Sequence, residues 1–264
     1  MKKKSDFINT RSAAILFASL SILTFLVVWY LSVSFTKIGK LIPTPFEVLE
    51  FFFRSFVKPV GRHTILEHAA ISLRRVMIGY LIGIGLGVIA GVGMGVSKTF
   101  EAVFKPIFEM LRPIPTIAWI PLAILWFGVG ETTKHFIIFY GTFANVTLNA
   151  YSGVMRVDPV LLGAAKMLGA TDRQLLPKVI LPASVPSIFA GMQTGLSAGW
   201  MGVIAAEMVK SSEGLGWTII MGQETANTTQ ILSGMVAIAI IGLLLATGMR
   251  TLERRLCRWN ERTS

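Results

Sequence analysis

The sequence has little charge and almost no cysteine. Only 15% of its 264 residues are Asp, Glu, Lys or Arg, while 53% are hydrophobic. That composition is too apolar for an ordinary soluble domain. The single cysteine, Cys257, excludes an intrachain disulfide and a cysteine-based metal site. The three histidines do not have the HExxH spacing of metalloproteases, so we expect no metal site.

Several sequence patterns are also missing. The chain has no GxxxxGK[ST] phosphate loop, no Ser, His and Asp set, and no paired carboxylates that would indicate catalysis. It has no internal repeat of about 20 to 50 residues and no polar linker between domains. We therefore expect no enzyme, and one membrane domain at 12–255 between short tails at 1–11 and 256–264.

Six stretches contain no Asp, Glu, Lys or Arg and are long enough to cross about 30 Å of hydrocarbon at about 1.5 Å per helical residue. They predict an all-α integral membrane protein with six transmembrane helices. The first run is long and is not followed by a small-residue cleavage site, so we expect it to remain as an anchor. The six runs are 12–36, 76–97, 113–130, 135–155, 179–206 and 225–249.

The basic residues indicate an orientation. Of the 25 Lys and Arg residues, sixteen lie in segments that are cytoplasmic if the N-terminus is inside, which predicts that both termini are cytoplasmic. Most of the other nine lie in 37–75, where the helix-like stretches 45–56 and 64–75 are expected, partly at the membrane interface. The net charge of +11 therefore indicates contact with anionic lipid rather than nucleic acid.

Two spans have unusual compositions. Glycines recur in the second span at 83, 87, 91 and 95, a spacing that lets another helix of the same subunit approach closely. The third span contains Pro113, Pro115 and Pro121, which free backbone carbonyls and kink a helix. Such backbone is tolerated in a membrane only beside protein or a water-filled cavity, so this span is expected to line a pathway or a core groove.

The segment 156–178 predicts two short helices on a cytoplasmic loop. Pro159 can begin the first helix and Gly169 can end it, while Thr171 or Asp172 can cap a second helix that runs to Leu176. The alternative to a partner-binding surface is a purely structural loop. The side chains expected to be exposed for a partner are Ala164, Ala165, Met167 and Leu168.

This loop carries a family resemblance. Gly163-Ala-Ala, then Gly169-Ala170, and then Leu181-Pro182 resemble the EAA loop of binding-protein-dependent ABC permeases, although Gly163 stands where that family usually has Glu. The blocks Leu41-Ile-Pro-Thr-Pro, Arg112-Pro-Ile-Pro and Gly214-Leu-Gly-Trp217 extend the resemblance to the permeases for taurine, aliphatic sulfonates, nitrate and bicarbonate. The block that begins at Trp126 is most similar to the taurine and sulfonate branch.

The resemblance implies a type I ABC importer permease of the bacterial inner membrane. Its implied partners are ABC ATPase subunits that hold ATP and Mg, a periplasmic or lipid-anchored solute-binding protein, and a second copy of this permease. This chain itself would hold no cofactor. The implied coupling residues are Gly163, Ala164, Ala165, Lys166, Met167, Leu168, Gly169, Ala170 and Asp172.

Polar or aromatic residues on otherwise apolar spans are candidates for a translocation pathway. We expect Glu207, at the outer end of the fifth span, to pair with Lys210 or to form part of an external gate. No buried cation is expected as a fixed anion site. The alternative for each residue is a hydrogen bond to a neighbouring helix. The candidates are Trp119, Asn145, Asn149, Gln193, Thr194, Ser197, Trp200 and Glu207.

The predicted function is ATP-driven import of a small anionic solute by alternating access, with taurine or another sulfonate favoured. Nitrate, bicarbonate, an aromatic acid or a vitamin precursor remains an alternative within the same class. A secondary transporter is the alternative of another class, but such proteins usually contain internal repeats and intramembrane ionisable groups.

Overall fold

The computed structural model describes residues 11–257, which form helices joined by short connections, with no named strand. The all-helical membrane fold expected from the charge-free runs is therefore confirmed for this part of the chain. The expected tails, 1–11 and 256–264, lie almost entirely outside the described residues. The elements are α1 Arg11–Phe35, η1 Lys37–Lys40, α2 Pro45–Arg54, α3 Ile65–Val96, α4 Lys98–Leu111, η2 Thr116–Trp119, α5 Ile120–Phe127, α6 Glu131–Met155, α7 Pro159–Met167, α8 Asp172–Leu175, η3 Leu176–Ile180, α9 Leu181–Val209, α10 Leu215–Glu224 and α11 Thr228–Leu256.

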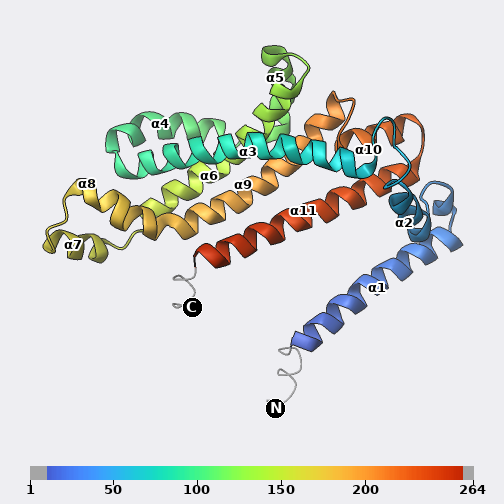
Figure 1. Cartoon of the computed structure of the whole chain (residues 1–264), viewed down its shortest axis with the longest axis horizontal. Helices are drawn as coiled ribbons and strands as arrows, with labels where there is room; N and C mark the ends of the chain where they lie inside the picture. The colour runs from blue at the N-terminus through green and yellow to red at the C-terminus, as the bar shows by residue number, and fades with distance from the viewer. Residues whose placement is uncertain (1–10, 258–264) are drawn as a thin grey trace.

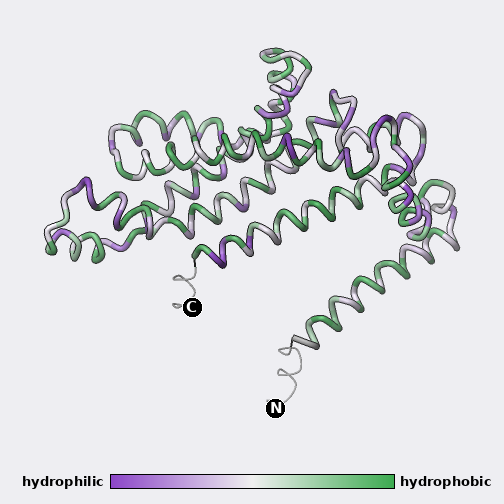
Figure 2. Tube along the Cα trace, viewed as in Figure 1, coloured by the Kyte–Doolittle hydropathy of each residue, from purple (hydrophilic) through white to green (hydrophobic). Residues whose placement is uncertain are grey.

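The long helices run in alternating directions. In Figure 1, α1 and α9 run one way, and α3, α6 and α11 run the other way. As a result, α7 and α8 lie near the end of the bundle where α11 finishes, and α2 and α10 lie at the opposite end. Hydrophobic residues follow α1, α3 and α11 along most of their length (Figure 2).

Local capping explains where the first helices begin. Thr44 and Glu47 form a capping box at the start of α2, and Thr64 and Glu67 form a second one at the start of α3. The two helix-like stretches predicted between 37 and 75 are therefore confirmed. The second does not end near Arg75 but continues as one 32-residue helix to Val96.

The centre of the fold is α6, which packs against α3 on one side and α9 on the other. The glycines of α3 permit this contact: a Cβ at Gly83 would lie 2.7 Å from the Thr142 Cβ, and one at Gly87 would lie 2.9 Å from the Val146 Cβ. The expectation that the glycine stripe packs inside the subunit is confirmed. Helices approach this closely in lipid because small residues let their backbones come together.

The third passage differs from the expected single span at 113–130. The chain instead forms α4, a break, and then η2 and α5, with the two helical parts bent by 92°. Pro113 and Pro115 lie in the break, and Pro121 lies in the first turn of α5, where a missing N–H is tolerated. Three prolines in nine residues thus break the helix rather than only kinking it.

The described helices differ in how well they suit a bilayer. Between residues 11 and 257, four helical stretches are long and apolar enough to cross, and the bent α4–α5 pair can be counted as a fifth. Helix α6 is not among them because it contains several polar residues. The fold accommodates these residues because α6 lies between α3 and α9. Helix α1 has no burial in its most apolar window and contacts mainly η1 and α2.

Candidate functional site

The α7–α8 loop has the local structure that its sequence predicts. The Asp158 carboxylate accepts a hydrogen bond from the Val160 N–H at 2.8 Å, and Pro159 occupies the first turn of α7. Gly169 ends the helix with φ of +85°, a conformation that favours glycine. Thr171 and Gln174 then form a capping box for α8. The start and end of the first helix and the start of the second are confirmed, but the second helix does not end near Leu176 and continues through η3 into α9.

Two large apolar side chains project from this loop. Met167 is 85% exposed and Leu168 is 89% exposed, whereas Ala164 and Ala165, which were expected to be exposed, are half-buried. Lys166 and Asp172 form a 3.1 Å ion pair between the two helices. Because both partners are mostly exposed, this pair contributes little to stability. The loop thus presents apolar side chains that the rest of the described chain leaves uncovered.

Gly163 stands at the position where the EAA loop usually has Glu. The space around Gly163 is open. No atom lies within 4 Å of the position where a Cβ at Gly163 would stand. A larger side chain at this position would point away from the subunit.

Five of the predicted pathway residues lie on α6 and α9, which pack against each other. A Cβ at Gly191 would lie 2.6 Å from the Asn149 Cβ and 3.3 Å from the Asn145 carbonyl oxygen, which places both asparagines beside the same part of α9. Thr194 and Ser197 are exposed on α9. We name Asn145, Asn149, Gln193, Thr194 and Ser197 the α6–α9 polar face.

The other three candidates lie elsewhere. Trp200 is only 7% exposed and packs toward α11, where a Cβ at Gly242 would lie 3.1 Å from its indole nitrogen. Trp119 packs against Tyr140 with ring centroids 4.8 Å apart and the rings tilted by 45°. Glu207 is fully buried in a network of charges described below. Trp200 and Glu207 are therefore not part of the α6–α9 polar face.

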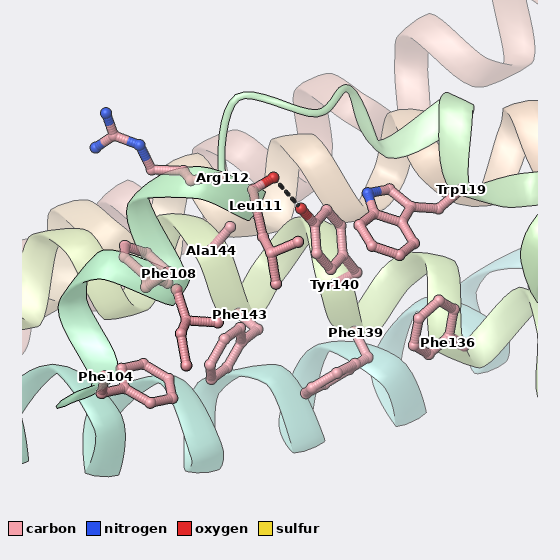
Figure 3. Close-up of a pocket in the computed structure, with 11 residues that line it drawn as sticks. Phe104, Phe108, Leu111, Arg112, Trp119, Phe136, Phe139, Tyr140, Phe143 and Ala144 are labelled. Carbon is pink, nitrogen blue, oxygen red and sulfur yellow. Dashed lines mark hydrogen bonds between the residues drawn. The ribbon is translucent and has the colours of Figure 1, made fainter.

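Trp119 belongs to an aromatic pocket of about 300 Å³ between α4, η2 and α6, shown in Figure 3. The Tyr140 hydroxyl donates a 2.7 Å hydrogen bond to the Leu111 carbonyl, one of the backbone groups freed at the proline-rich break. A protein side chain thus satisfies this carbonyl, as expected for irregular backbone at membrane depth. The aromatic lining residues are Phe104, Phe108, Trp119, Phe136, Phe139, Tyr140 and Phe143.

A buried arginine, Arg75, joins three segments at the end of the bundle near α10. Its guanidinium bonds Glu207 at 2.8 Å, Glu131 at 2.7 Å through two nitrogens, and Glu213 at 3.1 Å. Arg75 and Glu207 have no exposed side-chain surface. A buried charge is stable only when it is paired and hydrogen-bonded, and these carboxylates provide both.

One expectation is corrected by this arrangement. Glu207 pairs with Arg75 rather than with Lys210, because Arg75 lies on the adjacent face of α3. Arg75 is a buried cation, but its guanidinium is paired with Glu131, Glu207 and Glu213 of this chain. Arg75 stands one residue before the charge-free run at 76–97, so the sequence alone does not distinguish it from a charge in a flanking loop.

The same network begins α10. The N–H groups of Gly214, Leu215 and Gly216 donate to His68 Nδ1, Ser72 Oγ and a Glu207 carboxylate oxygen, each at 3.0 Å. These side chains satisfy N–H groups at the helix start that have no partner within the helix. This accounts for the Gly214-Leu-Gly-Trp217 block, because Gly214 has φ of +107° and a Cβ there would overlap the Glu207 carboxylate.

The described residues show no metal-binding cluster. Within residues 11–257, no group of three or more His, Cys, Asp or Glu side chains could hold a metal ion. Besides the Arg75 network, the described charges form further pairs such as Glu101 with Lys105 and Lys166 with Asp172. The arrangement is that of a helical membrane protein with an exposed loop.

Fold and site together define a helical permease of the inner membrane. The family model for the binding-protein-dependent transport system inner membrane component matches residues 83–260. The chain belongs to this family and is a permease subunit of an ABC importer. The family membership makes this chain a transport subunit.

Individual relatives cover most of the chain. It is 37% identical to the taurine transport system permease protein TauC of Escherichia coli (strain K12), over 89% of this chain and 86% of that protein. It is 35% identical to the putative aliphatic sulfonates transport permease protein SsuC of Bacillus subtilis (strain 168), over 84% and 79%. It is 27% identical to the nitrate import permease protein NrtB of Synechocystis, over 96% and 93%.

A solved structure shares the fold. The inward-facing MetNI methionine ABC transporter superimposes with a TM-score of 0.63 at 20% sequence identity, over 72% of this chain and 95% of that chain. This likeness supports the architecture of the helices.

Proposed function

We propose that this subunit carries an aliphatic sulfonate, with taurine as the first candidate, into the cell. The observation that carries the proposal is the greater identity to the taurine and sulfonate permeases, 37% and 35%, than to the nitrate permease, 27%. A solute-binding protein, periplasmic or lipid-anchored, would deliver the cargo. The permease would then expose it alternately to the two sides of the membrane.

The α7–α8 loop, residues 163–170 with Asp172, is our proposed docking surface for the ATPase partner. Met167 and Leu168 are suited to a pocket on that partner because they are almost fully exposed on two short, well-capped helices. ATP and Mg would be held there, since this sequence has no phosphate loop of its own. The orientation that places this loop in the cytoplasm also places both termini there.

The α6–α9 polar face is our proposed lining of the pathway. Its side chains are polar, whereas a lipid-facing surface would be apolar. On α9, Thr194 and Ser197 are exposed in the single subunit. A second copy of the chain would cover these two side chains. Helix α5 supports such a dimer because its Leu125 is 79% exposed and its Trp126 is 55% exposed, on a helix that projects from the rest of the subunit (Figure 1).

The experiment is ATPase activity and uptake in proteoliposomes that contain the permease, its ATPase and its binding protein. Wild type is compared with Gly169→Val, which a φ of +85° disfavours, and with Gly163→Ala, which adds only a methyl group in open space. We expect taurine to stimulate ATPase activity in wild type and Gly163→Ala, and to lose that effect in Gly169→Val.

The outcomes separate the alternatives. Stimulation of ATPase activity by nitrate but not by any sulfonate would show that the cargo is nitrate. The assignment to the ABC importers would still hold. Uptake by the permease alone, without the ATPase, would indicate a secondary transporter and overturn the proposal.

A further inference from the structure

Charged residues recur along one flank of α4. They are spaced by three or four residues, which places them on one face of a helix. The last of them, Arg112, follows the final helical residue but keeps the helical backbone, with φ of −53° and ψ of −41°. We name the set the α4 charged face, and its members are Lys98, Glu101, Lys105, Glu109 and Arg112.

The opposite flank of α4 is apolar and exposed at Val103 and Ile107. At about 100° per residue, Ile107 lies about 160° around the helix from Glu109. Between the two flanks, Phe104 and Phe108 line the aromatic pocket against α6. Helix α4 therefore has one exposed surface that suits lipid tails and another that does not.

The α4 charged face reaches far into the membrane. Helix α4 begins directly after α3 ends and runs back beside it (Figure 1). Its last carbonyl, that of Leu111, is bonded by Tyr140, and the neighbouring Phe139 carbonyl oxygen lies 3.1 Å from the Cβ position of Gly83 on α3. From Gly83 to the end of α3 is about 20 Å, in hydrocarbon that is about 30 Å thick. Arg112 thus lies at the depth of the hydrocarbon.

Charged side chains at this depth do not face lipid. They face either other protein or a water-filled cavity. Glu101 is bonded by Lys105 Nζ and by the Tyr151 hydroxyl. Glu109 and Arg112, farther along the helix, are exposed, and neither side chain has an ion pair or hydrogen bond with the residues that the structure describes.

The composition of the face favours water over another protein surface. It carries three cations and two carboxylates. Two copies of the chain pressed together there would bury an excess of cations, which is unfavourable without further partners. A hollow of about 430 Å³ also follows this face, from Lys98 to Glu109. Water in this hollow would keep the charges solvated.

Arg112 differs from the two lysines of the face. Lys98 and Lys105 each lie within ion-pair distance of Glu101. Arg112 stands at the proline-rich break, and Figure 3 shows its guanidinium directed away from the aromatic rings of the pocket. A guanidinium has five N–H donors in a planar fork and binds anionic oxygens through two of them at once. Arg112 is therefore suited to an anion that comes from outside the subunit.

We propose that the α4 charged face lines a water-filled part of the pathway, and that Arg112 contacts the anionic group of the cargo there. This inference rests on the proposed function and adds a contact residue outside the α6–α9 polar face. One exposed cation in water holds an anion only weakly. The solute can therefore leave again, which transport requires.

The first measurement tests for water beside α4. Single cysteines replace Glu109 or Ile107 in a Cys257→Ser background, because Cys257 is the only cysteine of the chain. The permease–ATPase complex in nanodiscs is treated with a thiol reagent that carries an ethylsulfonate arm, once without nucleotide and once with ATP and vanadate. We expect Glu109→Cys to react at least about tenfold faster than Ile107→Cys in one of these states, since the reactive thiolate forms in water and not in lipid. The two positions are matched in depth to about 3 Å.

The second measurement tests Arg112 in the Glu109→Cys protein. The reagent with the ethylsulfonate arm is compared with one that carries a trimethylammonium arm. The ratio of the two rates should fall by at least about threefold in Arg112→Gln and stay unchanged in Arg112→Lys, since only the first change removes a charge one helical turn away. Free ethanesulfonate should slow the sulfonate reagent only where Arg112 or its lysine replacement is present, and neutral ethanesulfonamide should not slow it.

The outcomes separate the parts of the inference. Equal reactivity at 109 and 107 in both states would overturn the water-filled face and indicate that another protein surface covers it. A rate ratio that Arg112→Gln leaves unchanged, or that Arg112→Lys lowers equally, would overturn the contact to the cargo. Taurine uptake by the wild-type proteoliposomes is measured in parallel. Uptake there would leave the proposed function standing when these tests fail, and its absence would contradict the proposed function itself.

Discussion

Arg75 on α3 and Glu207 on α9 face each other at 2.8 Å with both side chains completely buried. They are 132 residues apart in the sequence, and each also bonds further groups, Arg75 to Glu131 and Glu207 to Ser72. The pair therefore connects α3, α6 and α9 at the end of the bundle near α10. Any motion of α6 or α9 that separated these ends would expose a charge to a nonpolar interior.

Replacing one member of this pair is expected to destabilise the subunit strongly. Arg75→Met leaves buried Glu207 without its cation, and the loss should be about 3 to 5 kcal/mol of unfolding free energy. Denaturant unfolding in detergent measures it. The control is Lys98→Met, because Lys98 is 87% exposed in its ion pair with Glu101 and should contribute no more than about 1 kcal/mol. Equal losses in the two variants would contradict the structural role of Arg75.

Adding a methyl group at Gly214 should disturb the same network. The φ of +107° is strained for alanine, and the new Cβ would overlap the Glu207 carboxylate, so we expect Gly214→Ala to lower the unfolding free energy by more than about 1 kcal/mol. Gly248→Ala is the control, because no atom lies within 4 Å of its Cβ position in α11. That change should be neutral or stabilising. Thermal unfolding of both variants measures the two effects, and an equal loss of stability in both would contradict the prediction for Gly214.

Leu168→Ser should separate partner binding from stability. Leu168 is 89% exposed, so its replacement should change the unfolding free energy by less than about 0.5 kcal/mol. Co-purification of the ATPase should nevertheless fall by at least about tenfold if the side chain fills a partner pocket. Val160→Ser, on the same loop and 74% exposed, tests whether the effect belongs to the Leu168 position or to any exposed apolar residue. Unchanged co-purification in Leu168→Ser would remove this residue from the docking surface.

Tyr140→Phe should show how much the proline-rich break depends on one hydroxyl. The change removes the donor to the Leu111 carbonyl, and we expect a loss of about 0.5 to 1.5 kcal/mol in unfolding free energy. Tyr30→Phe on α1 is the matched control, since that ring is 43% exposed. The Ile114 N–H also donates to this carbonyl at 3.1 Å. A loss in Tyr140→Phe no larger than that in the control would show that the carbonyl does not need the hydroxyl.

Local features of this chain could be predicted from the sequence. The α7–α8 boundaries follow from Pro159, Gly169 and Thr171, because proline, glycine and threonine each act on the backbone at their own position. The glycine stripe of α3 likewise predicts a close helix contact. The charge-free runs predict the membrane helices, since inserting charge into hydrocarbon is unfavourable wherever it occurs.

Features that depend on distant contacts could not be predicted in the same way. The partners of Arg75 lie 56, 132 and 138 residues away, and no local pattern specifies which of them it meets. The residue type of Trp200 predicts a place in the pathway, but its side chain packs against Gly242 of α11, a contact 42 residues away that no local pattern specifies. The third passage was placed at 113–130 because α4 contains charges, which its short, bent arrangement tolerates.

The sequence separation within the Arg75 network also sets the order in which its members are made during translation. Arg75 leaves the ribosome 132 residues before Glu207, and at roughly 5 to 20 residues per second this is an interval of about 7 to 26 s. Glu131 follows Arg75 by 56 residues and can pair with it first. During the rest of that time Arg75 lacks Glu207, the carboxylate that is buried with it, so the network at the α10 end of the bundle is complete only when α9 has been made.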